Sequence, residues 1–301
     1  MKLILTTLLV LLAVGYAIRI VMCVLEHARG GSEKTPSRNP WMPTWHHLLI
    51  GFVTNFFDTL GIGNFAPTTA WFRHAKLVPD HLIPATMNVG HALPVVLMAL
   101  LYIEEVEIES TTLVSTIGSA IIGAWLGAGI VSNLPRQLIQ LGMALALLVA
   151  ATLMAAFLVG GEPSGNDALS LEGTKLVIAC LTIFLLGALM TIGVGLYAPC
   201  MILVSLLGMN PKAAFPIMMG ACAYLMPIAS LRFLNSRKLD LQAALGLTLG
   251  GWPAVLIAAL IVKSLPLGVL KWLVIAVVVL TAFQMLQAAA SSHQKHDQTV
   301  D

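Results

Sequence analysis

One carboxylate, Asp58, stands inside a long apolar stretch of this 301-residue chain, with polar side chains on both sides of a glycine-rich segment that follows it. An ionisable group at such a place is costly when the surroundings are lipid, and it marks a functional site by default. His91 lies further along, with Asn88 three residues before it and therefore on the same face of a helix. Asp58, His91 and Asn88 are candidates for carrying a proton or binding Na⁺. The alternative is a structural role, in which Asp58 and His91 only hydrogen-bond buried groups.

The segment after Asp58 carries a motif that occurs twice. Residues 61–67 and 193–199 both read G-x-G-x-[FY]-A-P, and the offset of 132 positions between them also pairs Pro79 with Pro211 and Pro84 with Pro216. This regularity predicts an internal duplication. Glycine tolerates positive φ and proline suits the first turn of a helix, so each motif predicts a helix, an unwound segment and a second helix that begins near Pro67 or Pro199.

Paired breaks of this kind point to a binding site, because irregular backbone at membrane depth is tolerated only where protein or a water-filled cavity covers it. The simpler alternative is a pair of kinked, tightly packed helices. Helix N-termini bind anions through free N–H groups and a partial positive charge. Two inverted hairpins would bring both new N-termini near the midplane, where they could hold an anion without a buried Arg or Lys. The residues expected to bind substrate are Gly61, Gly63, Asn64, Pro67, Thr68, Thr69, Gly193, Gly195, Tyr197, Pro199 and Cys200.

The elements that must position these residues are membrane helices. Hydrophobic residues make up 58% of the chain and charged residues 10%, with a mean hydropathy of +0.91. A soluble domain has about 25% charged residues. The composition therefore excludes a nucleic-acid-binding protein, a soluble nucleotide-binding fold and a disordered chain. The fold class predicted is an all-α polytopic membrane protein with two homologous, inverted repeats, each an interrupted, re-entrant hairpin plus three transmembrane helices.

A helix needs roughly 20 apolar residues to cross a bilayer. The predicted organisation is an extra, retained N-terminal helix and linker (1–44), repeat 1 (45–160), a polar linker (161–174), repeat 2 (175–290) and a polar tail (291–301). The predicted spans are 3–25, 82–103, 111–131, 138–160, 213–231, 242–262 and 267–290, and the interrupted elements are 45–78 and 175–208.

The placement of Lys and Arg favours hairpins over full crossings for the two interrupted elements. If both elements cross, one side of the membrane holds seven of these residues and the other eight, leaving Arg19 aside. If both return to their own side, the counts become ten and five. Only the second arrangement obeys the positive-inside rule. It places the N-terminus outside and the C-terminus inside.

Signatures of catalysis and of cofactor binding are absent from the sequence. The four cysteines are widely spaced in apolar runs, which suggests neither disulfides nor a zinc site. The patterns G-x-S-x-G, H-E-x-x-H and the phosphate-binding P-loop do not occur. We therefore expect no enzyme, cofactor or metal. Transport would be driven by an ion gradient, by the substrate's own gradient or by a partner protein.

The second half of the chain resembles the TauE/SafE sulfite exporter family, also called TSUP. The resemblance rests on Gly193-x-Gly195, Pro199, the run Leu207-Gly208-Met209-Asn210-Pro211-Lys212-Ala213-Ala214, Leu239-Asp240 and Leu265-Pro266. It extends over about residues 45–290, and the first half departs from it at Asn64, where the family often has Gly.

This resemblance implies transport of a small anion, such as sulfite, an organosulfonate, thiosulfate or a related carboxylate, across a prokaryotic cytoplasmic membrane. The partners expected are this anion, the lipid bilayer, and protons or Na⁺. The alternatives are an anion channel and a non-transporting membrane assembly or scaffold protein.

Overall fold

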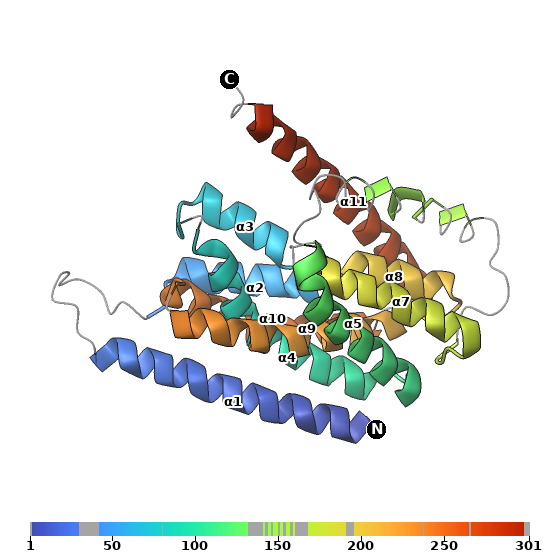
Figure 1. Ribbon diagram of the computed structural model, residues 1–301, viewed down its shortest axis with the longest axis horizontal. Coiled ribbons are helices and arrows are strands. Elements are labelled where there is room, and N and C mark those ends of the chain that lie inside the picture. Colours follow the sequence, from blue (N-terminus) through green and yellow to red (C-terminus); the bar gives the residue numbers. More distant parts are fainter. Residues whose placement is uncertain are drawn as a thin grey trace. The chain divides into compact units, whose positions relative to one another are not determined.

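The protein was analysed as a computed structural model, which describes residues 2–29, 42–79, 81–131, 168–190, 196–236, 238–264 and 266–297, with individual positions between 141 and 159. Within these ranges the regular structure is helical and contains no β-strand, which confirms the all-α fold class. Most of the predicted span 138–160 lies outside the described residues. The helices of Figure 1 are α1 (Lys2–Arg29), α2 (Trp45–Thr59), α3 (Phe65–His74), α4 (Ile83–Glu105), α5 (Ser110–Val131), α7 (Gly173–Met190), α8 (Tyr197–Leu206), the 3₁₀ turn η1 (Pro211–Ala213), α9 (Ala214–Ser236), α10 (Leu241–Ser264) and α11 (Leu267–Asp297).

Five of the described helical segments are long and apolar enough to cross a membrane. They contain 18 to 26 residues, which corresponds to about 27–39 Å at 1.5 Å per residue, against a hydrocarbon core of about 30 Å. The protein is therefore a multi-pass membrane protein. The segments are Lys2–Glu26, Ile83–Glu105, Gly173–Met190, Pro211–Ser236 and Leu241–Val262.

The chain folds into two compact units that do not follow its order. Unit 1 comprises Met1–Glu104 and Cys222–Ser264, and unit 2 comprises Glu105–Ala221 and Leu265–Asp301. As a result, α10 joins α2, α3 and α4, whereas α5 joins α7 and α8. Residues 110–131 of α5 correspond to residues 242–263 at the offset of 132 seen in the sequence. Each unit thus combines the hairpin of one predicted repeat with a helix of the other.

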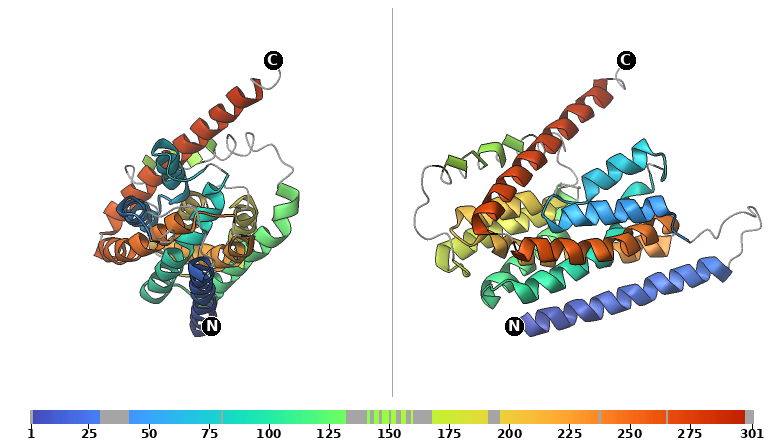
Figure 2. Two further views of the ribbon diagram at one scale, coloured as in Figure 1. Left: turned by 90° about the vertical axis from the view of Figure 1, so that its left-hand side faces the viewer. Right: turned by 180° about the vertical axis from the view of Figure 1, so that it is seen from behind.

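In unit 1, α2 and α10 lie side by side, as Figures 1 and 2 show, because glycines leave room for the backbones to approach. A Cβ atom added to Gly250 would lie 2.0 Å from the carbonyl oxygen of Leu48, and one added to Gly246 would lie 2.3 Å from Cβ of His47. The side-chain amide of Gln242, in the first turn of α10, donates to the carbonyl of Met42, just before α2. The two helices therefore run in the same direction.

The elements α2 and α3 form an antiparallel hairpin. At its turn, Nδ2 of Asn64 donates to Oδ2 of Asp58 at 2.9 Å. At its open end, the Phe72 ring meets the His47 ring edge-on, with centroids 6.5 Å apart. The ten residues of α3 span about 15 Å, which is half a membrane. An apolar cluster holds the return arm in place, formed by Ile50, Phe72, Val78, Ile83, Met87, Ala243 and Leu247.

Helix α4 then runs parallel to α2 and α10, and this direction distinguishes the two topologies weighed from the sequence. The backbone N–H of Asp240, before α10, donates to Oγ1 of Thr86 at 2.9 Å, and Oγ1 of Thr248 donates to the carbonyl of Gly90 at 2.7 Å. If the interrupted elements crossed the membrane fully, α4 and α10 would run in opposite directions. Their parallel course favours the hairpin arrangement.

Unit 2 contains a second hairpin, formed by α7 and α8. Nζ of Lys175, at the start of α7, donates to the carbonyl of Leu207, just past the end of α8, at 3.0 Å. Helix α5 crosses α7 as closely as α10 crosses α2. A Cβ atom added to Gly123 would lie 2.0 Å from the carbonyl oxygen of Phe184, and one added to Gly187 would lie 2.2 Å from that of Ala120.

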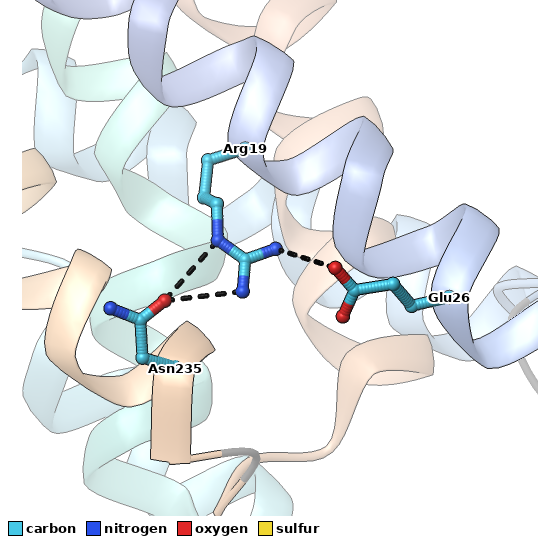
Figure 3. Close-up of polar contacts among 3 residues, drawn as sticks. All are labelled: Arg19, Glu26 and Asn235. Atoms are coloured by element: carbon cyan, nitrogen blue, oxygen red, sulfur yellow. Dashed lines mark hydrogen bonds and ion pairs between the residues drawn. The ribbon is translucent and has the colours of Figure 1, made fainter.

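Helix α1 belongs to unit 1, and polar contacts hold it against α4 and α9. The hydroxyl of Tyr16 donates to the carbonyl of Val89 in α4 at 3.1 Å. Figure 3 shows Arg19 between Asn235 and Glu26: Nε and Nη2 donate to Oδ1 of Asn235 at 3.2 and 3.1 Å, and Nη1 lies 3.5 Å from Oε1 of Glu26. The single charge within the apolar part of α1 is thus paired with protein groups.

Candidate functional site

The end of α2 is built by a glycine that adopts the left-handed conformation. Gly61 has φ of 93°, its N–H donates to the carbonyl of Asp58 at 2.8 Å, and the N–H of Ile62 donates to the carbonyl of Phe57 at 3.1 Å. This pair of bonds is the Schellman motif, which closes a helix. Gly63 also has a positive φ, of 88°. The two glycines of the sequence motif therefore make the unwound segment, as predicted.

The new helix α3 begins at Phe65, two residues before Pro67, which is close to the predicted start. Its N-cap residue is Asn64, whose own side chain does not cap the helix. The amide of Asn64 is directed at Asp58 instead. Pro67 has no N–H, and the Asn64 side chain does not bond to the N–H groups of the other residues in the first turn. Backbone N–H groups at the start of a helix can bind anions.

Five buried polar residues form one continuous hydrogen-bonded chain beside this helix end. Asp58, Asn64, Thr68, His91 and Asn55 are each at most 3% exposed. After the Asn64–Asp58 bond, Oγ1 of Thr68 donates to the carbonyl of Asn64 at 2.7 Å and lies 3.1 Å from Nε2 of His91. Nδ1 of His91 lies 3.0 Å from Oδ1 of Asn55. The structure thus brings together four of the predicted residues, which come from α2, α3 and α4.

Three other predicted residues of this region lie outside the chain. The hydroxyl of Thr69 donates to the carbonyl of Phe65 at 2.8 Å and contacts Sδ of Met87 at 3.3 Å. The amide of Asn88 donates to the carbonyl of Pro84 in its own helix at 3.2 Å. Pro67 is half-buried in the first turn of α3. Asn88 therefore does not share a contact with His91, although the two are three residues apart.

In the part of the chain that the structure describes, no cationic side chain acts on Asp58. A carboxylate that is 1% exposed and has Asn64 as its hydrogen-bonding partner carries a large desolvation cost as an anion, and a bound proton or cation removes that cost. The described residues include no group of three His, Cys, Asp or Glu side chains that could hold a metal ion.

The second predicted break resembles the first at the start of its second helix but carries different side chains there. Helix α7 ends at Met190, and Gly193 and Gly195 lie outside the described residues. Helix α8 begins at Tyr197, after Leu196, again without a capping side chain. Tyr197, Pro199 and Cys200 are all buried in the first turn. Leu196 is 2% exposed and Cys200 is fully buried.

Two residues that support the site were not singled out from the sequence. Asn55 holds His91, and its position three residues before Asp58, on the same helical face, was the available signal. Thr248 donates to the carbonyl of Gly90, which is the carbonyl that the N–H of residue 94 would take if that residue were not proline. Because Thr248 lies on α10, only knowledge of the α4–α10 pairing could have identified it.

The comparisons with known proteins identify a family for the chain. The family model for the sulfite exporter TauE/SafE matches residues 74–285, which is more than half of the chain. The match begins at the end of α3, so it includes α8, His91 and Asn88, whereas Asp58, Asn64 and Thr68 precede it; it is shorter at this end than the resemblance over 45–290. No curated protein and no solved structure gives a significant match. On the basis of the family match and its apolar helices, the chain belongs to the sulfite exporter TauE/SafE family of membrane transporters.

Proposed function

We propose that the protein is a secondary transporter that moves a small anion, such as sulfite, an organosulfonate or a related carboxylate, across a prokaryotic cytoplasmic membrane. The single observation that carries the proposal is the N-terminal end of α3, which the side chain of its N-cap residue Asn64 does not cap and which lies beside a buried, hydrogen-bonded carboxylate. The substrate class is taken from the family.

The anion binds at helix N-termini. At α3, the backbone N–H groups of the first turn and the side chains of Asn64, Thr68 and Thr69 are the donors within reach of the helix end. We extend the proposal to the first turn of α8, which carries the same motif and is also uncapped, with Tyr197 and Cys200 beside it. Partial charges of about half an elementary charge suit an anion that must be released again. A buried Arg or Lys would bind it more tightly.

Coupling to an ion gradient resides in Asp58 and His91. The two residues are joined through Asn64 and Thr68 by hydrogen bonds of 2.7 to 3.1 Å. A proton or Na⁺ bound at Asp58 changes the charge directly beside the start of α3. Binding of the cation therefore changes the affinity for the anion, and binding of the anion changes the affinity for the cation. Asn88 lies one helical turn away on α4 and is retained as a secondary candidate.

The test is sulfite flux in proteoliposomes that contain the purified protein, with and without an imposed pH gradient. Saturable flux that follows the gradient supports a proton-coupled transporter. Saturable flux that ignores the pH gradient but follows a Na⁺ gradient assigns Na⁺ as the coupling ion. An absence of sulfite flux contradicts sulfite as the substrate, and sulfonates and small carboxylates are then measured in the same vesicles.

The same vesicles separate a transporter from the other classes. A transporter shows counterflow, in which unlabelled substrate on one side accelerates the movement of labelled substrate from the other. An anion channel shows no such acceleration and no saturation at low substrate concentration. A scaffold protein shows no flux of any of these anions.

A further inference from the structure

The side-chain amide of Asn55 can adopt only one orientation in its surroundings. Its Nδ2 atom lies 2.7 Å from the carbonyl oxygen of Gly51 and 3.4 Å from that of Leu247 in α10. Carbonyl oxygens only accept hydrogen bonds, so the NH₂ group must face them. The opposite orientation would place two acceptor oxygens 2.7 Å apart with no proton between them. Oδ1 of Asn55 therefore faces His91.

This orientation fixes the position of a proton on His91. Oδ1 of Asn55 is an acceptor, and it lies 3.0 Å from Nδ1 of His91. Nδ1 must therefore carry the hydrogen, since a neutral imidazole has one donor and one acceptor nitrogen. The lone pair of the neutral ring is then on Nε2, 3.1 Å from the hydroxyl of Thr68.

The hydroxyl of Thr68 can form a hydrogen bond with Nε2 of His91 whether or not Nε2 carries a proton. Its hydroxyl proton has two acceptors within reach, Nε2 of His91 and the carbonyl oxygen of Asn64. That carbonyl also accepts the backbone N–H of Thr68 at 3.1 Å, so it keeps a partner when the hydroxyl turns to His91. When Nε2 gains a proton, the hydroxyl accepts from it and donates to Asn64. No heavy atom has to move.

We infer that Asn55 is a positioning residue that holds His91 in the Nδ1–H tautomer and so makes Nε2, which faces Thr68 and the start of α3, the atom at which the ring gains a proton. The inference rests on the proposed function and deepens it, because it identifies Nε2 as the atom through which His91 is hydrogen-bonded to the start of α3. The Asp58 carboxyl is the other titratable group in this chain of bonds, which it joins through Asn64.

The fit of Asn55 depends on a glycine in α10. A Cβ atom added to Gly251 would lie 2.6 Å from Nδ2 and 2.9 Å from Cγ of Asn55, and 2.7 Å from Cγ of Pro94. Gly251→Ala therefore displaces the amide without changing any hydrogen-bonding side chain. Gly118→Ala is the matched control, because a Cβ atom there would meet nothing within 4 Å.

The experiment is solid-state nitrogen-15 NMR of the full-length protein, labelled on histidine rings and reconstituted in lipid bilayers. The His91 signals are identified by their loss in His91→Gln. We expect a protonated Nδ1 and an unprotonated Nε2 in the wild-type protein. In Asn55→Leu and Gly251→Ala the Nε2–H form should appear, whereas Gly118→Ala should retain the wild-type signals. A wild-type protein with Nε2–H would overturn the inference, as would an unchanged tautomer in Asn55→Leu.

If Asn55→Leu does not fold, the wild-type tautomer and Gly251→Ala decide the question. This outcome is independent of transport: the expected tautomer with no flux of any anion would leave the inference standing and refute the proposed function. In the flux assay, Asn55→Leu should reduce gradient-driven flux several-fold more than exchange. An equal loss of both would assign Asn55 a purely structural role.

Discussion

The N-terminal ends of α3 and α8 have nearly the same backbone conformation, but the residues at corresponding positions around them differ in polarity. Both helices contain ten residues and begin 132 positions apart. The residue before each has nearly the same conformation, with φ and ψ of −96° and −22° at Asn64 and of −84° and −24° at Leu196. Yet the residues that correspond at this offset to Asp58, Asn64, Thr68 and His91 are Met190, Leu196, Cys200 and Ala223.

The two hairpins also differ in which of the two packed helices carries the glycine. Asn55 in α2 is accommodated by Gly251 in α10. At the same offset, α7 has Gly187 and α5 has Ser119, and the backbones there are too close for any side chain at 187. The two breaks share the start of their second helix, the feature on which the proposed anion binding depends. The polar chain, on which the proposed coupling depends, lies at the first break.

The largest effect should come from Asp58. We expect Asp58→Asn to abolish gradient-driven transport while sparing anion exchange, because the amide keeps the hydrogen bonding but cannot exchange a proton or neutralise Na⁺. Both modes are measured in proteoliposomes. Glu107→Gln, which removes a carboxylate from an exposed loop, is the control. Equal loss of both modes would make Asp58 a structural or substrate-contacting residue and would weaken the contrast between the breaks.

The next effect should separate two glycines that correspond at the offset of 132. Gly250→Ala places a Cβ atom 2.0 Å from a backbone oxygen of α2, whereas Gly118→Ala meets nothing within 4 Å. We expect Gly250→Ala to lower the free energy of unfolding by about 1–3 kcal/mol through overpacking, and Gly118→Ala to change it little. Thermal unfolding in detergent, followed by tryptophan fluorescence, measures both. Similar midpoints for the two variants would contradict the close α2–α10 crossing.

A smaller effect is expected at Thr68. Thr68→Val leaves Nε2 of His91 buried without a partner, which should cost about 1 kcal/mol of stability and slow gradient-driven flux. The control is Thr116→Val in α5, a buried threonine whose hydroxyl bonds only to carbonyls of its own segment, those of Thr112 and Leu113. If both variants lose the same stability, the Thr68–His91 contact contributes nothing specific.

The smallest effect should lie outside both hairpins, at the contact of α1 with α9. Asn235→Ala removes the acceptor of two bonds from Arg19, but the pair is partly exposed and Glu26 remains. We expect a loss of less than about 1 kcal/mol and unchanged coupling. The same unfolding and flux assays measure these, and a large loss of flux would show that α1 takes part in the transport cycle.

Much of the fold could be predicted because its determinants are local. Apolar runs predict the helices, and Gly61, Gly63 and Pro67 predict where α2 ends and α3 begins, since positive φ and a missing N–H act within one turn. Asp58 and His91 stood out because ionisable residues are rare in apolar stretches. The charges at the loops favoured hairpins, with which the parallel course of α2, α4 and α10 agrees.

The remaining features depend on which helices pair, and periodicity carries no such information. Thr248 and Gly251 read as ordinary residues of an apolar helix until α10 is placed against α2 and α4. Asn88 is a second case: it lies on the same helical face as His91, but its amide donates to the carbonyl of Pro84 in its own helix. Asn64 was predicted as a substrate ligand, and only the structure shows that its amide also donates a hydrogen bond to Asp58.

The membership of α10 in unit 1 has a consequence for biosynthesis. The hydrogen bond between Asn55 and the carbonyl of Leu247 joins residues 192 positions apart. When α2 leaves the ribosome, the helix against which it packs has not been made, so its polar residues must wait in the membrane or at the insertion machinery until α10 emerges. A chain truncated after α9 should therefore be degraded, and the missing α10–α11 segment, supplied as a separate polypeptide in the same cell, should rescue it.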